Sequence, residues 1–354
     1  MIRVVVAEDS LTVRELLVEI LESDPQIKVV GQAKNGAEAV ELAMRLKPDL
    51  ITMDVHMPVM DGFEATKEIM VQAPRPIIIV SSSASHEDVE LSFNAMRAGA
   101  LMVVAKPDNP QSDLFDGRRE QFLTMAKAMA QVKVVRRWAP QTQVATPPVT
   151  LRRAPGARLR LVALAASTGG PAALQRILTD LPGDFPVPIL VVQHIATGFV
   201  TGLADWLGSG CNLRVKVAED GEPLRARTVY LAPENRQLGV HADDRILVAA
   251  APPVKGFQPS ATFLFQSAAR AYGAALAAVI LTGMGNDGVE GLKAVKAAGG
   301  VVLAQDEASS VVYGMPREAV EAGVVDAVMS INEVAARLTN LVAGGNDAHT
   351  HPGR

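Results

Sequence analysis

Three acidic residues and one lysine stand where apolar runs end in the N-terminal part of the sequence. Glu8 and Asp9 follow the first run, Asp54 follows the third and Lys106 follows the fifth. Because the carboxyl ends of parallel strands meet at one edge of a sheet, we expect these side chains to converge. Packed carboxylates repel one another unless a hard cation joins them, and Mg²⁺ prefers oxygen ligands. The set predicts a phosphoryl-transfer site with Asp54 as the acceptor.

A serine, a histidine and an aspartate occupy comparable positions later in the chain. Ser167 ends an apolar run and precedes Gly-Gly-Pro, His194 ends the next run, and Asp287 lies in a glycine-rich turn after another. Each residue alone has a simpler interpretation: Ser167 as a helix cap in an anion-binding loop, His194 as a packed residue, and Asp287 as part of a turn. Together they could supply a nucleophile, a general base and an orienting carboxylate.

The first group requires an α/β domain to position it. Short β-branched runs alternate with amphipathic stretches, which predicts a doubly wound, mainly parallel sheet over residues 1–125. The expected strands are 2–7, 27–32, 49–53, 76–81 and 101–105, and the expected helices are 12–23, 36–46, 62–71 and 87–98. A further helical stretch is expected at 118–138, before a Pro-, Thr-, Gln- and Arg-rich segment, so residues 126–157 are interpreted as a helical extension and linker.

The second group requires a second α/β domain, also doubly wound and mainly parallel, which we expect over residues 158–342. The expected strands are 159–165, 187–193, 213–217, 228–232, 245–249, 276–282 and 301–305, with a hairpin near 237–249. The tail at 343–354 is rich in small and polar residues and is expected to be disordered.

The composition narrows the class of protein. A chain of 354 residues exceeds what one core usually serves, which agrees with two domains. The net charge of −4 gives no general attraction for nucleic acid, and no apolar stretch approaches the ~20 residues that a membrane-spanning helix needs. Cys211 is the only cysteine, which excludes an intramolecular disulfide and favours the reducing cytoplasm. We therefore expect neither nucleic-acid binding nor membrane insertion.

The N-terminal motifs are Val-Ala-Glu-Asp-Ser, Met-Asp-Val-His-Met-Pro-Val-Met-Asp-Gly and Ala-Lys-Pro. This set closely resembles the response-regulator receiver family. The resemblance implies that a sensor histidine kinase phosphorylates Asp54, that Lys106 contacts the phosphoryl group, and that Ser81 is the hydroxyl residue that switches the surface. It also implies a Mg²⁺ site formed by carboxylates and by one backbone carbonyl, with the ligands Glu8, Asp9, Asp54 and His56.

The C-terminal motifs are Ala-Ser-Thr-Gly-Gly-Pro, Gln-His-Ile, Leu-Ala-Pro and Leu-Thr-Gly-Met-Gly-Asn-Asp-Gly. They resemble the catalytic domain of chemotaxis protein-glutamate methylesterases. The resemblance implies that Ser167 attacks the methyl ester of a chemoreceptor glutamate, that His194 takes its proton, and that Asp287 orients the imidazole. The same chemistry on an amide implies glutamine deamidation. Neither hydrolysis needs a metal or an organic cofactor.

Two backbone N–H groups are candidate oxyanion donors. They are those near Thr168 and Met284, because neighbouring glycines let a substrate approach the backbone closely. Met284 also matches the family position for this role. The resemblance further implies that the unphosphorylated receiver obstructs the esterase and that phosphorylation of Asp54 relieves this. The alternative is a noncatalytic module that binds receptors in a phosphorylation-dependent way.

Overall fold

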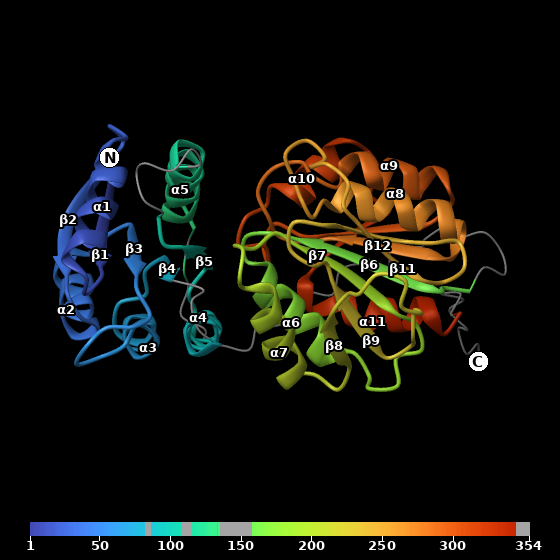
Figure 1. The fold of residues 1–354 in the computed structure, drawn as a ribbon, viewed down its shortest axis with the longest axis horizontal. Coiled ribbons are helices and arrows are strands. Elements are labelled where there is room, and N and C mark those ends of the chain that lie inside the picture. The colour runs from blue at the N-terminus through green and yellow to red at the C-terminus, as the bar shows by residue number, and fades with distance from the viewer. Residues whose placement is uncertain (82–85, 108–114, 133, 135–157, 345–354) are drawn as a thin grey trace, which may run out of the picture. The chain divides into compact units, whose positions relative to one another are not determined.

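The computed structural model describes residues 1–81, 86–107, 115–132, 134 and 158–344. Most of the expected linker and of the expected disordered tail lie outside these residues. The chain divides into two compact units, one built on the strands before the linker and the other on the strands after it (Figure 1). Of the described helices, none combines the length and apolar character that crossing a bilayer requires.

The first unit is a five-stranded parallel sheet with the strand order β2-β1-β3-β4-β5. Its elements are β1 Ile2–Ala7, α1 Leu11–Glu22, β2 Ile27–Ala33, α2 Gly36–Leu46, β3 Leu50–Met53, α3 Gly62–Gln72, β4 Ile77–Ser81, α4 His86–Ala98, β5 Met102–Ala105 and α5 Phe115–Ala130. Every residue of the central strand β3 is buried. The Asn35 and Asp61 side chains cap α2 and α3 by accepting hydrogen bonds from backbone N–H groups in their first turns. The predicted doubly wound architecture is confirmed.

The last helix of this unit differs from the expectation. The prediction was a helix at 118–138, but α5 begins at Phe115 and ends at Ala130. Val132 and Val134 follow it, and β-branched residues are poor helix formers. Lys127 Nζ lies 2.7 Å from Asp24 Oδ2, and this ion pair joins α5 to the turn that follows α1. The expected boundary at residue 125 therefore falls inside a helix that packs on this unit.

The second unit contains a seven-stranded parallel sheet with the order β14-β13-β12-β6-β7-β9-β8. Its elements are β6 Leu161–Ala166, α6 Gly170–Asp180, β7 Ile189–Gln193, α7 Val200–Ser209, β8 Arg214–Val217, β9 Thr228–Leu231, β10 Gln237–Val240, β11 Ile246–Ala249, α8 Ala261–Tyr272, the 3₁₀ turn Gly273–Ala275, β12 Leu276–Ile280, α9 Val289–Ala297, β13 Val301–Gln305, α10 Met315–Glu321, β14 Ala327–Met329 and α11 Ile331–Val342. The predicted hairpin is confirmed as the antiparallel pair β10-β11.

The core of the second unit lies around its central strands. All residues of β6, β7 and β12 are buried, as expected for parallel strands covered on both faces. Helices α8, α9 and α10 lie on one side of the sheet, and α6 and α11 lie on the other (Figure 1). This packing fixes the ends of β6, β7 and β12 side by side. Strand β14 was not predicted, because three residues are too few to show a period.

Candidate functional sites

The carboxyl edge of the first sheet brings the predicted acidic residues and the lysine together. Lys106 Nζ lies 2.9 Å from Asp54 Oδ2 and 2.9 Å from Glu8 Oε2, so one ammonium group joins two carboxylates. Glu8 is 0% exposed and Asp54 is 3% exposed. Ser81 ends the neighbouring strand β4 and is also buried. The residues predicted for phosphoryl transfer thus lie at one edge of the sheet.

Burial dominates the electrostatics of this cluster. It raises the pKa of Asp54, against the opposing effect of Lys106. Burial also raises the pKa of Glu8, and the neighbouring Asp54 adds to that rise. Burial lowers the pKa of Lys106, but Asp54 and Glu8 outweigh it, so the net shift is upward. The carboxylates therefore hold more negative charge than one lysine can stabilise, which favours an additional cation.

The carboxylates fit the expected Mg²⁺ site. One oxygen from each of Glu8, Asp9 and Asp54 can be chosen so that all three lie within 4.8 Å of one another, and Asp9 is exposed. An exposed ligand suits Mg²⁺, which keeps several of its waters. The His56 side chain lies elsewhere, with Nε2 2.5 Å from Asp88 Oδ1, so only its backbone carbonyl remains as a candidate ligand.

In the second unit, three adjacent strands present the predicted serine, histidine and aspartate. Ala166 of β6 pairs with Gln193 of β7, so Ser167 and His194 follow at neighbouring positions of the same edge. Strand β12 lies on the other side of β6, and Asp287 lies in the turn that follows it. Ser167 N–H donates to the carbonyl of Thr282, which ties the serine turn to that side.

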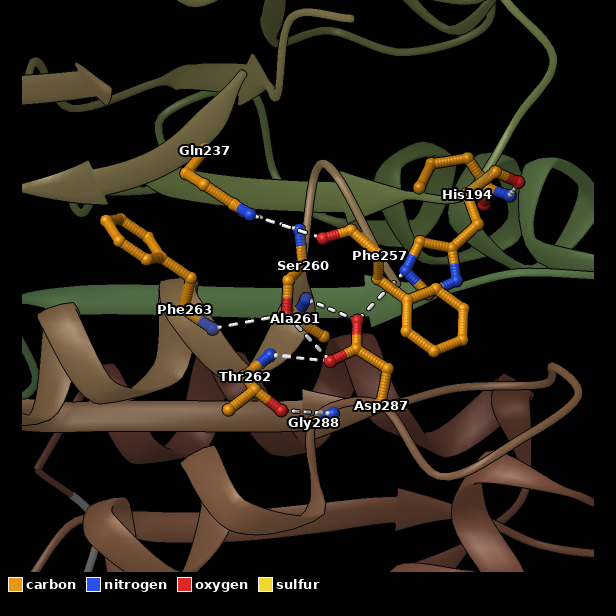
Figure 2. Close-up of polar contacts among 10 residues, drawn as sticks. His194, Gln237, Phe257, Ser260, Ala261, Thr262, Phe263, Asp287 and Gly288 are labelled. Carbon is orange, nitrogen blue, oxygen red and sulfur yellow. Dashed lines mark hydrogen bonds and ion pairs between the residues drawn. The ribbon is translucent and has the colours of Figure 1, made fainter. Parts of the chain in front are cut away.

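Asp287 is 2% exposed and is held by four donors (Figure 2). Its oxygens accept hydrogen bonds from Ser260 Oγ at 2.8 Å, and from the backbone N–H groups of Ala261 at 2.7 Å and Thr262 at 3.1 Å. His194 Nε2 lies 3.0 Å from Asp287 Oδ2. Burial alone would raise the pKa of Asp287, but the interactions with His194, Ser260 and Thr262 outweigh burial and lower it to about 2. This carboxylate is therefore ionised at neutral pH.

The contact with Asp287 determines which nitrogen of His194 is available. Because Nε2 faces a carboxylate, it carries the proton, and Nδ1 keeps the lone pair. Nδ1 is buried and has no hydrogen-bond partner among the described residues. The imidazole also stacks on the ring of Phe257, with centroids 4.7 Å apart and an interplanar angle of 16°. The ring is thus fixed on one edge and one face.

The serine turn is closely packed. Gly169 adopts a φ of +77°, and a Cβ on Gly283 would lie 2.7 Å from the Ser167 Cβ, so both positions require glycine. The Ser167 hydroxyl makes no hydrogen bond within the described part of the chain, and neither do the backbone N–H groups of Thr168 and Met284. The turn therefore presents a hydroxyl and two free donors.

Sequence reasoning assigned no role to three polar residues that support this site. Ser260 bonds Asp287, buried Gln237 accepts a hydrogen bond from Ser260 N–H, and Gln193 donates to the carbonyls of Ser167 and His194. A Pro-Ser pair before an apolar stretch is a helix-start signal that could have placed Ser260 at the N-terminus of α8. No local pattern indicates which buried carboxylate that helix end would face.

Comparisons with known proteins agree with both domains. The family model described as CheB methylesterase matches residues 162–338, and the model described as Response regulator receiver domain matches residues 4–114. The catalytic domain of the CheB methylesterase of Thermotoga maritima aligns with a TM-score of 0.51 and 40% identity, covering 52% of this chain and 99% of that structure.

Two curated relatives match almost the whole chain. Protein-glutamate methylesterase/protein-glutamine glutaminase 4 of Myxococcus xanthus is 55% identical, covering 97% of this chain and 98% of the relative. Protein-glutamate methylesterase/protein-glutamine glutaminase 3 of Anaeromyxobacter dehalogenans is 52% identical, covering 96% of this chain and 98% of the relative. With its receiver domain ahead of the methylesterase domain, the chain belongs to the family of CheB protein-glutamate methylesterases.

Proposed function

We propose that this protein hydrolyses the methyl esters of glutamate side chains on chemoreceptors and deamidates receptor glutamines, under the control of phosphorylation at Asp54. The observation that carries the hydrolase assignment is the arrangement around His194. Its Nε2 is anchored to an ionised carboxylate, while its Nδ1 has no hydrogen-bond partner in the described part of the chain. A partly buried imidazole held in one tautomer at the edge that presents a serine is suited to act as a general base.

The chemistry begins when Ser167 Oγ attacks the ester carbonyl carbon. His194 Nδ1 takes the hydroxyl proton, and the carbonyl oxygen becomes an oxyanion. The free N–H groups of Thr168 and Met284 are the donors for that oxyanion. Collapse of the tetrahedral intermediate breaks the bond to methoxide, which leaves as methanol with the proton from Nδ1, and the glutamyl group remains on Ser167.

Water completes the reaction. Nδ1 takes one proton from the water as its oxygen attacks the acyl carbon, and this proton then returns to Ser167 Oγ as the bond to the acyl carbon breaks. The released glutamic acid side chain loses the second water proton to solvent and becomes the carboxylate. With a glutamine substrate, protonated Nδ1 supplies its proton to the leaving ammonia instead of methanol. Asp287 stays ionised throughout, which its low pKa permits, and stabilises the imidazolium by Coulombic attraction.

The receiver supplies the control. Asp54 Oδ attacks the phosphorus of a phosphohistidine on a partner kinase, the bond between phosphorus and the histidine nitrogen breaks, and Lys106 neutralises the phosphoryl oxygens. Mg²⁺ bound by Glu8, Asp9, Asp54 and the His56 carbonyl would supply further positive charge. Ser81 at the end of β4 is the residue that responds to the phosphoryl group. In this proposal, the receiver extends through α5 and the protein acts in the cytoplasm.

The test is methanol release from methylated receptor membranes. Wild type is compared with Ser167→Ala and with Ser209→Ala, which removes an exposed hydroxyl at the end of α7. We expect Ser167→Ala to lose release by about 10⁴-fold or more, and Ser209→Ala to retain it. Receptor binding without methanol release by the folded, phosphorylated wild type would instead support the noncatalytic binding module.

A further inference from the structure

The segment between β11 and α8 places an aromatic ring on the base. The Phe257 ring is nearly parallel to the His194 imidazole, at a centroid distance of 4.7 Å (Figure 2). The reaction requires the imidazole to keep its Nε2 contact with Asp287 while Nδ1 gains and loses a proton. Rotation of the imidazole about its bond to Cβ would disrupt both functions. A flat ring against one face restricts that rotation.

The backbone of this segment holds the Phe257 ring in place. Val254 and Phe257 exchange two backbone hydrogen bonds of 3.0 Å across a tight turn. The turn residues Lys255 and Gly256 have φ values of +50° and +88°, which are typical of a two-residue hairpin turn. The ring therefore projects from a closed turn.

One buried amide connects this turn to Asp287. Gln237 is 0% exposed, and its Nε2 donates to the carbonyls of Phe257 and Pro252 at 3.2 Å each. Its Oε1 accepts from Ser260 N–H at 2.8 Å, and Ser260 Oγ in turn donates to Asp287. The same side chain thus fixes the support for the base and the support for its orienting carboxylate.

The stacking also has an electrostatic consequence. The face of an aromatic ring carries negative potential, and a cation within about 6 Å of the ring centroid is attracted to it. His194 becomes a cation only while it holds the proton from Ser167. The Phe257 ring consequently stabilises the charged imidazole more than the neutral one, which lowers the barrier to acyl transfer.

We propose that Phe257 is a positioning residue for His194, which holds the imidazole in its productive orientation and stabilises its protonated form. This inference rests on the proposed hydrolase function. It assigns to Phe257 an effect on the turnover step, with little effect on substrate binding.

The experiment compares Phe257→Leu with Phe257→Tyr in the full chain. Leucine keeps apolar bulk but removes the ring, whereas tyrosine keeps the ring. Phe263→Leu is the matched control, because Phe263 is a partly buried phenylalanine of α8 that has no stacking contact among the described residues. We expect Phe257→Leu to lower kcat for methanol release by about 10- to 100-fold with KM nearly unchanged, and Phe257→Tyr to restore most of the rate.

Nuclear magnetic resonance of histidine-labelled protein supplies a readout that a merely structural role would not change. The ring current of Phe257 should shift the His194 ring protons, and this shift should persist in Phe257→Tyr and vanish in Phe257→Leu. A kcat loss in Phe257→Leu no larger than in Phe263→Leu would overturn the proposal. A change confined to KM would also overturn it, because Phe257 would then contact substrate.

A second assay separates this proposal from the hydrolase assignment. A fluorophosphonate reacts with an activated serine by forming an oxygen–phosphorus bond and releasing fluoride, so its rate reports on the base without a receptor substrate. If wild type releases no methanol but is labelled at Ser167, the ester assignment fails, and slower labelling of Phe257→Leu than of Phe263→Leu still supports the role of Phe257. Equal labelling rates would contradict that role.

Discussion

Asp54 and Asp287 are both buried aspartates at the carboxyl edge of a parallel sheet, yet their electrostatics are opposite. Burial raises the pKa of Asp54, whereas the pKa of Asp287 is lowered to about 2 although burial opposes that shift. Asp54 accepts a hydrogen bond from its neighbour Val55 and pairs with a lysine that it shares with Glu8. Within the described ranges, Asp287 has four donors and no carboxylate among its contacts.

The difference shows how one residue type serves two kinds of chemistry. In the proposed function Asp54 must react with phosphorus, and among the described residues its Oδ2 contacts only the mobile ammonium of Lys106, while Oδ1 accepts one backbone hydrogen bond. In the same proposal Asp287 must only orient an imidazole, and it can therefore be fully bonded by the protein. The number of fixed donors, rather than the depth of burial, separates the two roles.

Substitution of the two aspartates should differ most in its effect on the rate of hydrolysis. Asp287→Asn should lower kcat for methanol release by about 10³- to 10⁴-fold, because an amide at this position no longer holds the imidazole in the productive tautomer. Steady-state methanol release without a phosphodonor measures this. A comparable loss in Asp54→Asn under the same conditions would show that the two carboxylates do not have separate roles.

The next effect is the pH dependence of stability, which should have opposite signs at the two sites. The lowered pKa of Asp287 contributes stability that is present above its ordinary value of 3.8 and is lost as the pH falls to about 2. The contribution is about 2 kcal/mol. The raised pKa of Asp54 means that its native form binds the proton more tightly, so its ionisation destabilises the fold above pH 3.8.

Hydrogen-exchange rates of peptides from β3 and from β12 report the local stability of the first and the second unit separately in one sample. At pH 7, we expect Asp54→Asn to slow exchange in β3 and Asp287→Asn to speed it in β12, with both differences shrinking toward pH 2. Faster exchange in β3 of Asp54→Asn at pH 7 would contradict the assigned direction of the Asp54 pKa shift.

The smallest effect is the response of the receiver to Mg²⁺. Binding to the Glu8, Asp9 and Asp54 cluster should stabilise the first unit by about 1.4 kcal/mol at a concentration ten times the Kd. Asp9→Asn should reduce this gain, and Asp24→Asn, which removes an acid that pairs with Lys127, should keep it. The measurement is the hydrogen-exchange protection of β3 with and without Mg²⁺. An equal gain in the Asp9 and Asp24 variants would place the cation elsewhere.

The sequence predicted the strands that end at the two sites because each is a continuous apolar run followed by polar or glycine residues. It therefore also placed Ser167, His194 and Asp287 at the ends of three strands. The end of α5 was wrong by eight residues, since valines continued an apolar pattern without favouring a helix.

The supports of the histidine and the aspartate could not be predicted. Gln237, Phe257 and Ser260 come from a hairpin strand, a turn and a helix start, and their contacts with His194 and Asp287 depend on how these elements pack. Contacts between distant loops leave no periodic signal in the sequence.

The central claim is that phosphorylation of Asp54 controls hydrolysis at Ser167. Its most direct test is methanol release from methylated receptor membranes by wild type and Asp54→Asn, each with and without a small-molecule phosphodonor and Mg²⁺. We predict that release rises with the phosphodonor in wild type and does not rise in Asp54→Asn. An equal rise in both proteins, or no rise in wild type that is demonstrably phosphorylated, would contradict the claim.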